Sequence, residues 1–354
     1  MKGLDVKQLL QKAQVEGILV TDPYNMRYLS GFSGGEGALF LAENARIIIT
    51  DSRYTEAAGK ESDFIVLEES RKNPRGEILS QLVREHRISC LGFEDGAVTY
   101  QQYEGFRKNL QDQKFIPLGN LLDSLRAVKT EKELSLIRRA ESIGDVAFSK
   151  ILEILKPGIS ELEVAAELEY QMKRAGAEGL SFDTIVASGV HSSMPHAVPT
   201  EKKLEWGDFV TMDFGCRYQG YCSDMTRTVV IGKASQEQKK IYNTVLEAQR
   251  LALDQLCAGK AGKEIDAVAR NHIAEAGYGK CFGHGLGHSL GLFIHEEPRL
   301  SPEEDALLLP RMVETVEPGI YVPGFGGVRI EDLAVVKDHG CENYTGSPKE
   351  LIEL

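Results

Sequence analysis

Two pairs of acidic residues in this sequence are spaced so that each pair could bind metal across a turn. Asp213 lies near the end of one strand-like run, and Asp224 precedes a second run at residues 225–231. Gly220 lies between them, so we expect a hairpin whose turn centres near residue 218, with the two aspartates as close cross-strand neighbours. Two carboxylates that face each other on a half-buried sheet repel strongly unless a cation lies between them.

A pair of glutamates repeats this arrangement later in the chain. Glu317 precedes one apolar run and Glu331 lies in another, and residues 323–327, Pro-Gly-Phe-Gly-Gly, form a strong turn signal between them. A strand pair joined by this turn would bring the two glutamates together. One buried acid pair could be accidental, whereas two are difficult to accommodate without a metal or a base.

Three histidines lie between the acid pairs, spaced by four and seven residues: His284, His288 and His295. The glycines among them argue against a helix, so we expect an extended or looped segment with close backbone approach. An imidazole is the natural nitrogen ligand to complete an oxygen-rich site for Mn, Co, Fe or Zn. Four carboxylates and one histidine suit two divalent ions, which would lower the pKa of a shared water.

Each of these residues also has an ordinary structural interpretation. A single aspartate at a strand end is usually a cap, and a single histidine is usually structural, as we expect for His86, His272 and His339. The combined pattern of two aspartates, one histidine and two glutamates around glycine turns favours metal. Two other motifs fail: G-x-S-x-G at residues 31–35 precedes a strand-like run, and the HExxH-like start at His295 lacks its second histidine.

The first third of the chain alternates strand-like runs with amphipathic stretches. We expect a helix from Val6, a strand at residues 17–21 and a hairpin within residues 38–50, with further helices at 75–87 and 99–112. This order indicates an α/β domain with a mixed sheet.

The pattern changes near residue 122, where we place a domain boundary. A capping box at Thr130 opens a long helix that reaches Ile151, and a second helix is expected at residues 160–175. Strands at 184–188, 208–215 and 223–231, helices at 235–257 and 263–276, and a glycine-rich, strand-like last quarter follow. We therefore expect two domains, at residues 1–122 and 123–354.

Composition narrows the class of protein. The chain has 354 residues, with 53 Asp+Glu against 41 Lys+Arg and a net charge of -12, which argues against nucleic acid as a partner. No apolar run is long enough to span a membrane, and residues 1–5 lack the apolar core of a signal peptide. Six cysteines without paired spacing indicate reduced thiols and a cytoplasmic location.

These motifs resemble the metallopeptidase family with the pita-bread fold, which includes methionine aminopeptidase, aminopeptidase P and prolidase. The resemblance to the Xaa-Pro peptidases is most specific from Ser188 to Asp332, and the first 120 residues resemble the N-terminal domain of prolidase, aminopeptidase P and creatinase. It implies an α+β pita-bread catalytic domain preceded by a smaller α/β creatinase-like domain. The family's five metal ligands have their matches in Asp213, Asp224, His288, Glu317 and Glu331.

The resemblance also implies roles for further residues. His196 matches the histidine that contacts the tetrahedral intermediate or the leaving group, and His295 matches the one near the scissile carbonyl. His284 and Arg329 match residues that line the pocket and support the ligands. Glu317 is both a ligand and the expected proton carrier from water to the proline nitrogen. The family supplies no role for His191.

The resemblance implies hydrolysis of the peptide bond before proline, with two divalent ions as cofactors: manganese, or cobalt or zinc in its place. Arg299 resembles the arginine that clamps the free carboxylate of a dipeptide in prolidases, which favours an Xaa-Pro dipeptidase. An Xaa-Pro aminopeptidase that acts on longer peptides is the alternative. A non-catalytic peptide-binding module and a creatinase-like amidinohydrolase are disfavoured because the ligand set is intact. Expected partners are proline-containing di- or oligopeptides and a second copy of the chain, as a homodimer, with no membrane partner.

Overall fold

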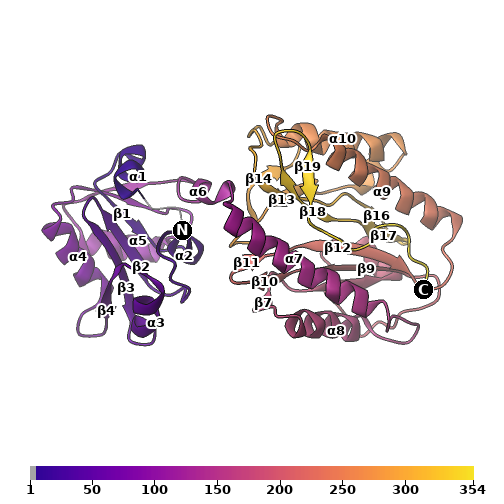
Figure 1. Ribbon diagram of the computed structural model, residues 1–354, viewed down its shortest axis with the longest axis horizontal. Coiled ribbons are helices and arrows are strands. Elements are labelled where there is room, and N and C mark those ends of the chain that lie inside the picture. Colours follow the sequence, from indigo (N-terminus) through magenta and orange to yellow (C-terminus); the bar gives the residue numbers. More distant parts are fainter. Residues whose placement is uncertain (1–4) are drawn as a thin grey trace. The chain divides into compact units, whose positions relative to one another are not determined.

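A computed structural model describes residues 5–354 as two compact units, one ending at Arg126 and the other spanning Ala127–Leu354 (Figure 1). Residues 1–4, on which the expectation of a missing signal peptide partly rests, lie outside the described residues. Within the described chain, no helix is both long and apolar enough to cross a membrane. The domain boundary expected near residue 122 stays a prediction, and it precedes the division between the compact units by four residues.

The first unit is built on a six-stranded mixed sheet in the order β4-β3-β2-β1-β5-β6. The hairpin predicted within residues 38–50 is confirmed, because β2 and β3 pair antiparallel. Apolar side chains fill both faces of the central strand: Ile18 and Val20 pack into one core and Leu19 into the other. The elements are α1 (Val6–Ala13), β1 (Gly17–Val20), α2 (Pro23–Ser30), β2 (Ala38–Ala42), β3 (Ala45–Asp51), α3 (Thr55–Glu61), β4 (Ile65–Glu69), α4 (Arg75–Glu85), β5 (Cys90–Phe93), α5 (Tyr100–Asn109), β6 (Lys114–Pro117) and α6 (Ser124–Ala127).

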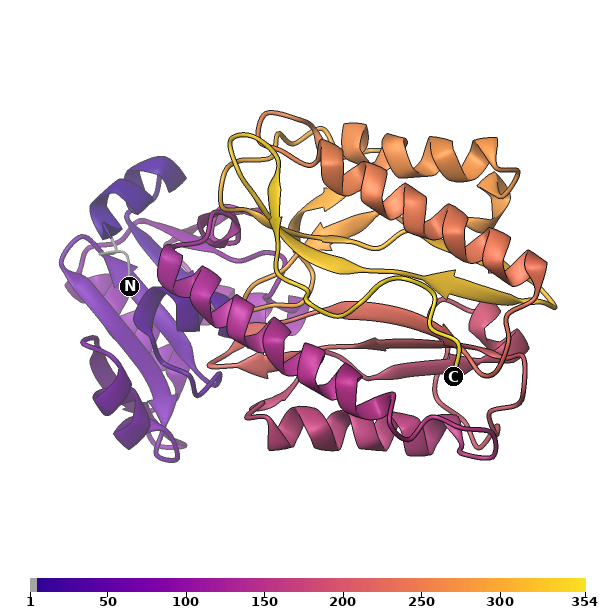
Figure 2. The ribbon, with the colours of Figure 1, turned by 45° about the vertical axis from the view of Figure 1, so that its right-hand side comes forward.

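In the second unit, one pair of helices lies on each side of the strands. Helices α7 (Glu131–Ile151) and α8 (Glu161–Arg174) cover one side, and α9 (Gln236–Gln255) and α10 (Gly262–Glu275) cover the other (Figure 2). The capping box predicted at Thr130 is confirmed, since its side chain accepts from the backbone of Glu133. The expected α+β unit after a smaller α/β unit is therefore present.

The strands of the second unit form four small antiparallel sheets. They are β7 (Gly179–Leu180), β8 (Ile185–Ser188), β9 (Phe209–Phe214), β10 (Cys216–Tyr218), β11 (Tyr221–Cys222), β12 (Met225–Val230), β13 (Gly287–Ser289), β14 (Glu296–Leu300), β15 (Val313–Val316), β16 (Gly319–Val322), β17 (Gly326–Arg329), β18 (Asp332–Val336) and β19 (Cys341–Asn343). Short 3-10 turns occupy Gly189–Ser193 and Gly279–Cys281.

The predicted hairpin that carries the two aspartates exists, but its register differs from the expectation. Tyr218 pairs with Tyr221, so the turn is Gln219-Gly220 and not centred near residue 218. Both turn residues have positive φ, 47° and 84°, the backbone of a tight two-residue hairpin. Asp213 therefore lies opposite Thr226, and Asp224 is its diagonal neighbour on the same face.

The predicted strand pair that carries the two glutamates is confirmed, and its register is continuous across a break. Strands β16 and β17 pair with Gly319 opposite Arg329, while β15 and β18 pair with Val316 opposite Asp332. Both ladders follow the same register, which places Glu317 opposite Glu331 in the gap between them. The two acids thus lie where the chain leaves one sheet for the next.

The histidine segment is extended or looped, as predicted. Only Gly287–Ser289 is strand, and β13 lies between β14 and β15. Gly287 is required by space, because a Cβ there would overlap the carbonyl oxygen of Thr315. This close approach places the main chain of His288 beside β15, where its N–H donates to Thr315 Oγ1 at 3.0 Å.

The C-terminal segment packs behind the strands that carry the acids. Arg227, which is fully buried, donates to the carboxylate of Asp332 at 2.7 Å and to the carbonyl oxygens of Glu331 and Ser347 at 2.5 and 2.7 Å. At the edge of β12, Val230 exchanges backbone hydrogen bonds with Ile352 and Leu354. The C-terminal segment thereby supports the strands that carry the acids on the side away from the acids.

Candidate active site

The five residues predicted as metal ligands come together in the second unit. One carboxylate oxygen from each of Asp213, Asp224 and Glu331 lies within 4.8 Å of the others. The Nε2 atom of His288 is 3.5 Å from Asp224 Oδ2 and 3.6 Å from Glu317 Oε1. Asp213 lies on β9 and His288 on β13, whereas the other three acids lie in the short gaps between strands, so the cluster depends on the folded unit.

Burial makes this cluster electrostatically costly. Asp224 and Glu331 are 5% and 1% exposed. Burial, reinforced by the neighbouring Asp213 and Glu317, holds the pKa of Asp224 well above its ordinary value. Burial and the charge of Asp224 do the same for Glu331, and burial raises the pKa of Glu317 although His288 and Arg329 oppose the rise. Such acids ionise together only when positive charge is placed among them.

The donor set fits divalent metal ions. Asp213 Oδ1 is buried and has no hydrogen-bond partner among the described residues, as expected of an atom that awaits a ligand. The Nδ1 atom of His288 lies 3.0 Å from the Ser289 carbonyl oxygen, which can accept only if that nitrogen carries the proton. The Nε2 lone pair then points to the acids, as a metal-binding imidazole requires.

All ten residues predicted from the sequence to form the site line one cavity of about 520 Å³. The ligands are Asp213, Asp224, His288, Glu317 and Glu331, and the other five are His196, His284, His295, Arg299 and Arg329. The structure thus brings every one of them together, while their individual roles stay predictions. Phe182, Asp183 and Ile185 also line the cavity, and the sequence analysis had not singled them out.

Arg329 links the metal ligands to a hydrogen-bonded chain on one wall. Its Nη2 donates to Asp213 Oδ2 at 2.5 Å and its Nη1 donates to the Tyr321 hydroxyl at 2.7 Å. That hydroxyl lies 3.0 Å from Nε2 of His284, whose Nδ1 is 2.7 Å from the Gly285 carbonyl oxygen. Burial, with Arg329 nearby, lowers the pKa of His284 to about 4, so it is neutral at pH 7.

Two threonines support the glutamates and were missed from the sequence. Thr226 Oγ1 donates to Glu331 Oε2 at 2.7 Å and accepts from Arg329 Nε at 3.0 Å. Thr315 Oγ1 donates to Glu317 Oε1 at 3.2 Å. Both lie one or two residues from a predicted ligand or its strand partner, a position that could have marked them.

The loop that carries His196 is tied down by a buried carboxylate. Glu161, at the start of α8, accepts from the backbone N–H and hydroxyl of both Ser188 and Thr200, at 2.7 to 3.0 Å. Nδ1 of His191 lies 2.9 and 3.0 Å from its two oxygens. The carboxylate therefore closes the ends of the segment between residues 188 and 200. This gives His191 a structural position, which the sequence had left without a role.

Arg299 lies on β14 and His295 immediately precedes this strand, at another part of the cavity. The ring of His295 is 4.7 Å from that of His288, and burial together with the charge of neighbouring groups lowers the pKa of His295 to about 4. A neutral imidazole can donate one hydrogen bond to a carbonyl oxygen without repelling the metals. The Arg299 side chain is half exposed and its Nε lies 3.2 Å from Glu297 Oε1.

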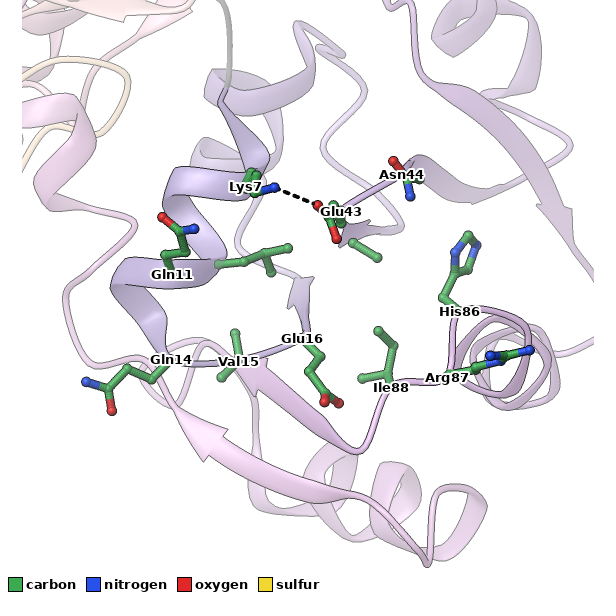
Figure 3. Close-up of a pocket in the computed structure, with 12 residues that line it drawn as sticks. Lys7, Gln11, Gln14, Val15, Glu16, Glu43, Asn44, His86, Arg87 and Ile88 are labelled. Carbon is green, nitrogen blue, oxygen red and sulfur yellow. Dashed lines mark ion pairs between the residues drawn. The ribbon is translucent and has the colours of Figure 1, made fainter.

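A second cavity, of about 610 Å³, lies in the first unit between α1, the β2–β3 turn and the end of α4 (Figure 3). Its polar rim includes an ion pair of 3.0 Å between Lys7 and Glu43, both largely exposed. None of the residues with predicted chemistry lines it apart from His86, which we had taken as structural. The acid cluster, and any metal chemistry that it supports, therefore belong to the other cavity.

Comparison with known proteins places both units. Residues 135–338 match the model of metallopeptidase family M24, and residues 5–128 match the creatinase/prolidase N-terminal domain. A solved structure of an Xaa-Pro dipeptidase from Bacillus anthracis is 44% identical, with a TM-score of 0.96 and 99% of each chain covered. An X-Pro aminopeptidase from Thermotoga maritima is 39% identical, with a TM-score of 0.91, and 98% of this chain and 100% of that chain covered. An Xaa-Pro dipeptidase from Pyrococcus horikoshii is 40% identical over 98% of this chain and 97% of its own.

Proposed function

The chain belongs to metallopeptidase family M24, and from this premise we propose that it hydrolyses the peptide bond before proline, with Xaa-Pro dipeptides as its substrates. The observation that carries the proposal is the convergence of Asp213, Asp224, His288, Glu317 and Glu331 in one cavity. Relatives named Xaa-Pro dipeptidase support the substrate class.

The residues of the cavity divide the work of hydrolysis. Two divalent ions, when bound by the five ligands, supply Lewis acidity and a water of lowered pKa. Glu317, beside His288, is positioned to take a proton from the attacking water and to return it to the leaving proline nitrogen. His196 and His295 donate to the carbonyl oxygen as it gains charge, and Arg329 with Thr226 holds Asp213 and Glu331 in place.

The choice between dipeptides and longer peptides depends on how the site binds the part of the substrate that follows the scissile bond. Arg299 lines the cavity with a half-exposed guanidinium, which suits bidentate recognition of a free carboxylate. The Thermotoga maritima relative named X-Pro aminopeptidase favours the alternative, in which longer peptides are accepted.

Steady-state kinetics with Ala-Pro and with a longer Ala-Pro peptide tests the choice. We expect wild-type protein to prefer Ala-Pro, and Arg299→Ala to raise its KM about 10- to 100-fold while leaving the longer peptide almost unchanged. Efficient cleavage of the longer peptide that is insensitive to Arg299→Ala would establish the aminopeptidase instead. No bound metal and no hydrolysis after reconstitution would favour a non-catalytic binding module.

We propose manganese as the metal, with cobalt or zinc as substitutes, because an oxygen-rich site with one imidazole accepts several first-row ions. Activity and metal content measured with each ion in turn would rank them. A cytoplasmic homodimer is also proposed. All six cysteines are free thiols, in agreement with a reducing compartment, and the family resemblance supports the dimer. Sedimentation at equilibrium would determine the oligomeric state.

A further inference from the structure

The segment between β7 and β8, two strands that border the aspartate hairpin, forms a bulge next to the cavity. Leu180 of β7 pairs with Cys216, whereas Ile185 of β8 pairs with Asp213. Leu180 and Ile185 are five positions apart, whereas their partners Cys216 and Asp213 are three apart, so the connection between the two strands carries two extra residues. Bulges bend a strand and redirect side chains, and they are frequent beside active sites.

This bulge contains Asp183, which lines the cavity. Asp183 and its neighbour Phe182 line the cavity together with Ile185, which lies directly opposite Asp213 and so shares its face. A Cβ at Gly215 would lie 2.0 Å from the carbonyl oxygen of Ser223 and 3.0 Å from the ring of Phe182, so the glycine lets both segments approach closely. The carboxylate of Asp183 is therefore carried to the metal-binding face of the sheet without being a member of the ligand cluster.

Asp183 differs from the other acids of the cavity in having no partner. Asp213 is paired with Arg329, Asp224 and Glu317 lie beside His288, and Glu331 accepts from Thr226. Across residues 5–354, no side chain or backbone group forms a hydrogen bond or ion pair with Asp183. Because the four other acids of the cavity are the proposed metal ligands, Asp183 is the acid there that stays available to a substrate.

We propose that Asp183 binds the free α-ammonium group of the residue before proline. This inference rests on the proposed function and deepens it: the substrate class is a peptide whose amino terminus immediately precedes the Xaa-Pro bond. The apolar Phe182 and Ile185 flank the carboxylate and provide a surface for the side chain of the same residue. Asp183 and Arg299 then recognise the two opposite charges of a zwitterionic dipeptide.

The test compares Ala-Pro with propionyl-proline, which has the same shape but lacks the amino group. We expect Asp183→Asn to lower kcat/KM for Ala-Pro about 10- to 100-fold, the range for loss of a charged hydrogen bond. The inhibition constant of propionyl-proline, measured against Ala-Pro, should change less than about threefold, because that ligand makes no use of the carboxylate. Asp183→Glu should restore much of the activity.

Two controls separate this role from others. Glu303→Gln removes one negative charge from an exposed residue two positions after Ser301, which lines the cavity, and should leave both ligands unaffected. Metal content of Asp183→Asn should equal that of the wild type. A parallel loss for both ligands, a loss of metal or an unchanged kcat/KM for Ala-Pro would overturn the inference. Failure of the wild-type protein to hydrolyse Ala-Pro would instead overturn the proposed function.

Discussion

Glu317 and Glu331 lie opposite each other in the gap between two ladders of one register, β15–β18 and β16–β17. The gap frees both residues from the regular pairing of either sheet. The N–H of Glu317 donates instead to the Leu286 carbonyl oxygen at 2.8 Å, and that of Glu331 donates to the Thr226 carbonyl oxygen at 3.1 Å. The glutamates are thereby attached to the two other segments that supply ligands.

Metal removal should destabilise the second unit, because the buried acids then repel one another. Saturating manganese at 100 times Kd should restore about 2.7 kcal/mol relative to chelated protein. In chelator, Asp224→Asn should melt higher than the wild type, since it deletes one charge of the cluster and keeps its shape. Thermal unfolding in chelator and after manganese addition measures both effects. Equal melting of the two chelated proteins would show that repulsion is not what the metals relieve.

Tyr321→Phe should lower kcat/KM for Ala-Pro about tenfold or more, as for other groups that orient ligands at one remove. The substitution leaves Arg329 Nη1 and His284 Nε2 without the hydroxyl between them. Bound metal should persist, because Arg329 Nη2 still reaches Asp213. Tyr278→Phe, which removes a surface hydroxyl bonded to Glu237, is the matched control. Loss of metal from Tyr321→Phe, or an equal loss of activity in the control, would contradict this assignment.

Glu161 should make the protein sensitive to acid. Burial alone would raise its pKa, but hydrogen bonds from His191, Thr200 and Ser188 lower the pKa of Glu161 below the ordinary 4.5. A group with a lowered folded pKa stabilises the native state above its unfolded pKa, and that contribution is lost as pH falls through the folded value. Chemical denaturation between pH 7 and pH 3 should show this loss below about pH 4.5.

Glu161→Gln should remove about 1.5–3 kcal/mol at pH 7 and flatten the acid dependence, because a neutral amide cannot titrate. It should also raise KM, since the carboxylate closes the loop that carries His196. Glu169→Gln on the same helix serves as the control. If stability of the variant fell with pH as it does in the wild type, Glu161 would not be the cause of the acid sensitivity.

Gly287→Ala should destabilise the protein by about 1–3 kcal/mol and reduce metal binding, because the new methyl group overlaps the Thr315 carbonyl oxygen and displaces His288. Gly283→Ala is the matched control in the same segment, since a Cβ there meets nothing within 4 Å. Melting temperature and metal titration compare the two variants. Similar behaviour of both would show that close packing at Gly287 does not position the histidine.

The sequence predicted which acidic side chains come together, because turn residues and strand pattern specify which side chains meet. The glutamate pair is in the predicted place, since glycines at 324 and 326 have positive φ and define one loop. The aspartate hairpin was displaced by about one residue because Gln219 occupies a left-handed position that glycine or asparagine would have signalled. The displacement changes the cross-strand partners but not the face to which each side chain points, so both aspartates still lie on one face of the sheet.

What the sequence did not reveal depends on contacts between distant segments. Asp183 reaches the cavity through a bulge that only the unequal spacing of two strand pairings discloses. Glu161 looked like an ordinary first-turn acid of a helix, although it holds a loop that begins 27 residues later. Tyr321 lay inside an apolar run, where a tyrosine suggests packing rather than a link between Arg329 and His284.

The packing of residues 352–354 against β12 has a consequence for synthesis in the cell. Asp224 is translated about 128 residues before Ile352, which pairs with the edge of β12. At about 5–20 residues per second, Asp224 waits roughly 5–21 s for Glu331 and roughly 6–26 s for Ile352. The first unit, whose cores lie within its own residues, can fold during this interval. We therefore expect metal loading to be a late event, because the full set of proposed ligands exists only after Glu331 has been translated.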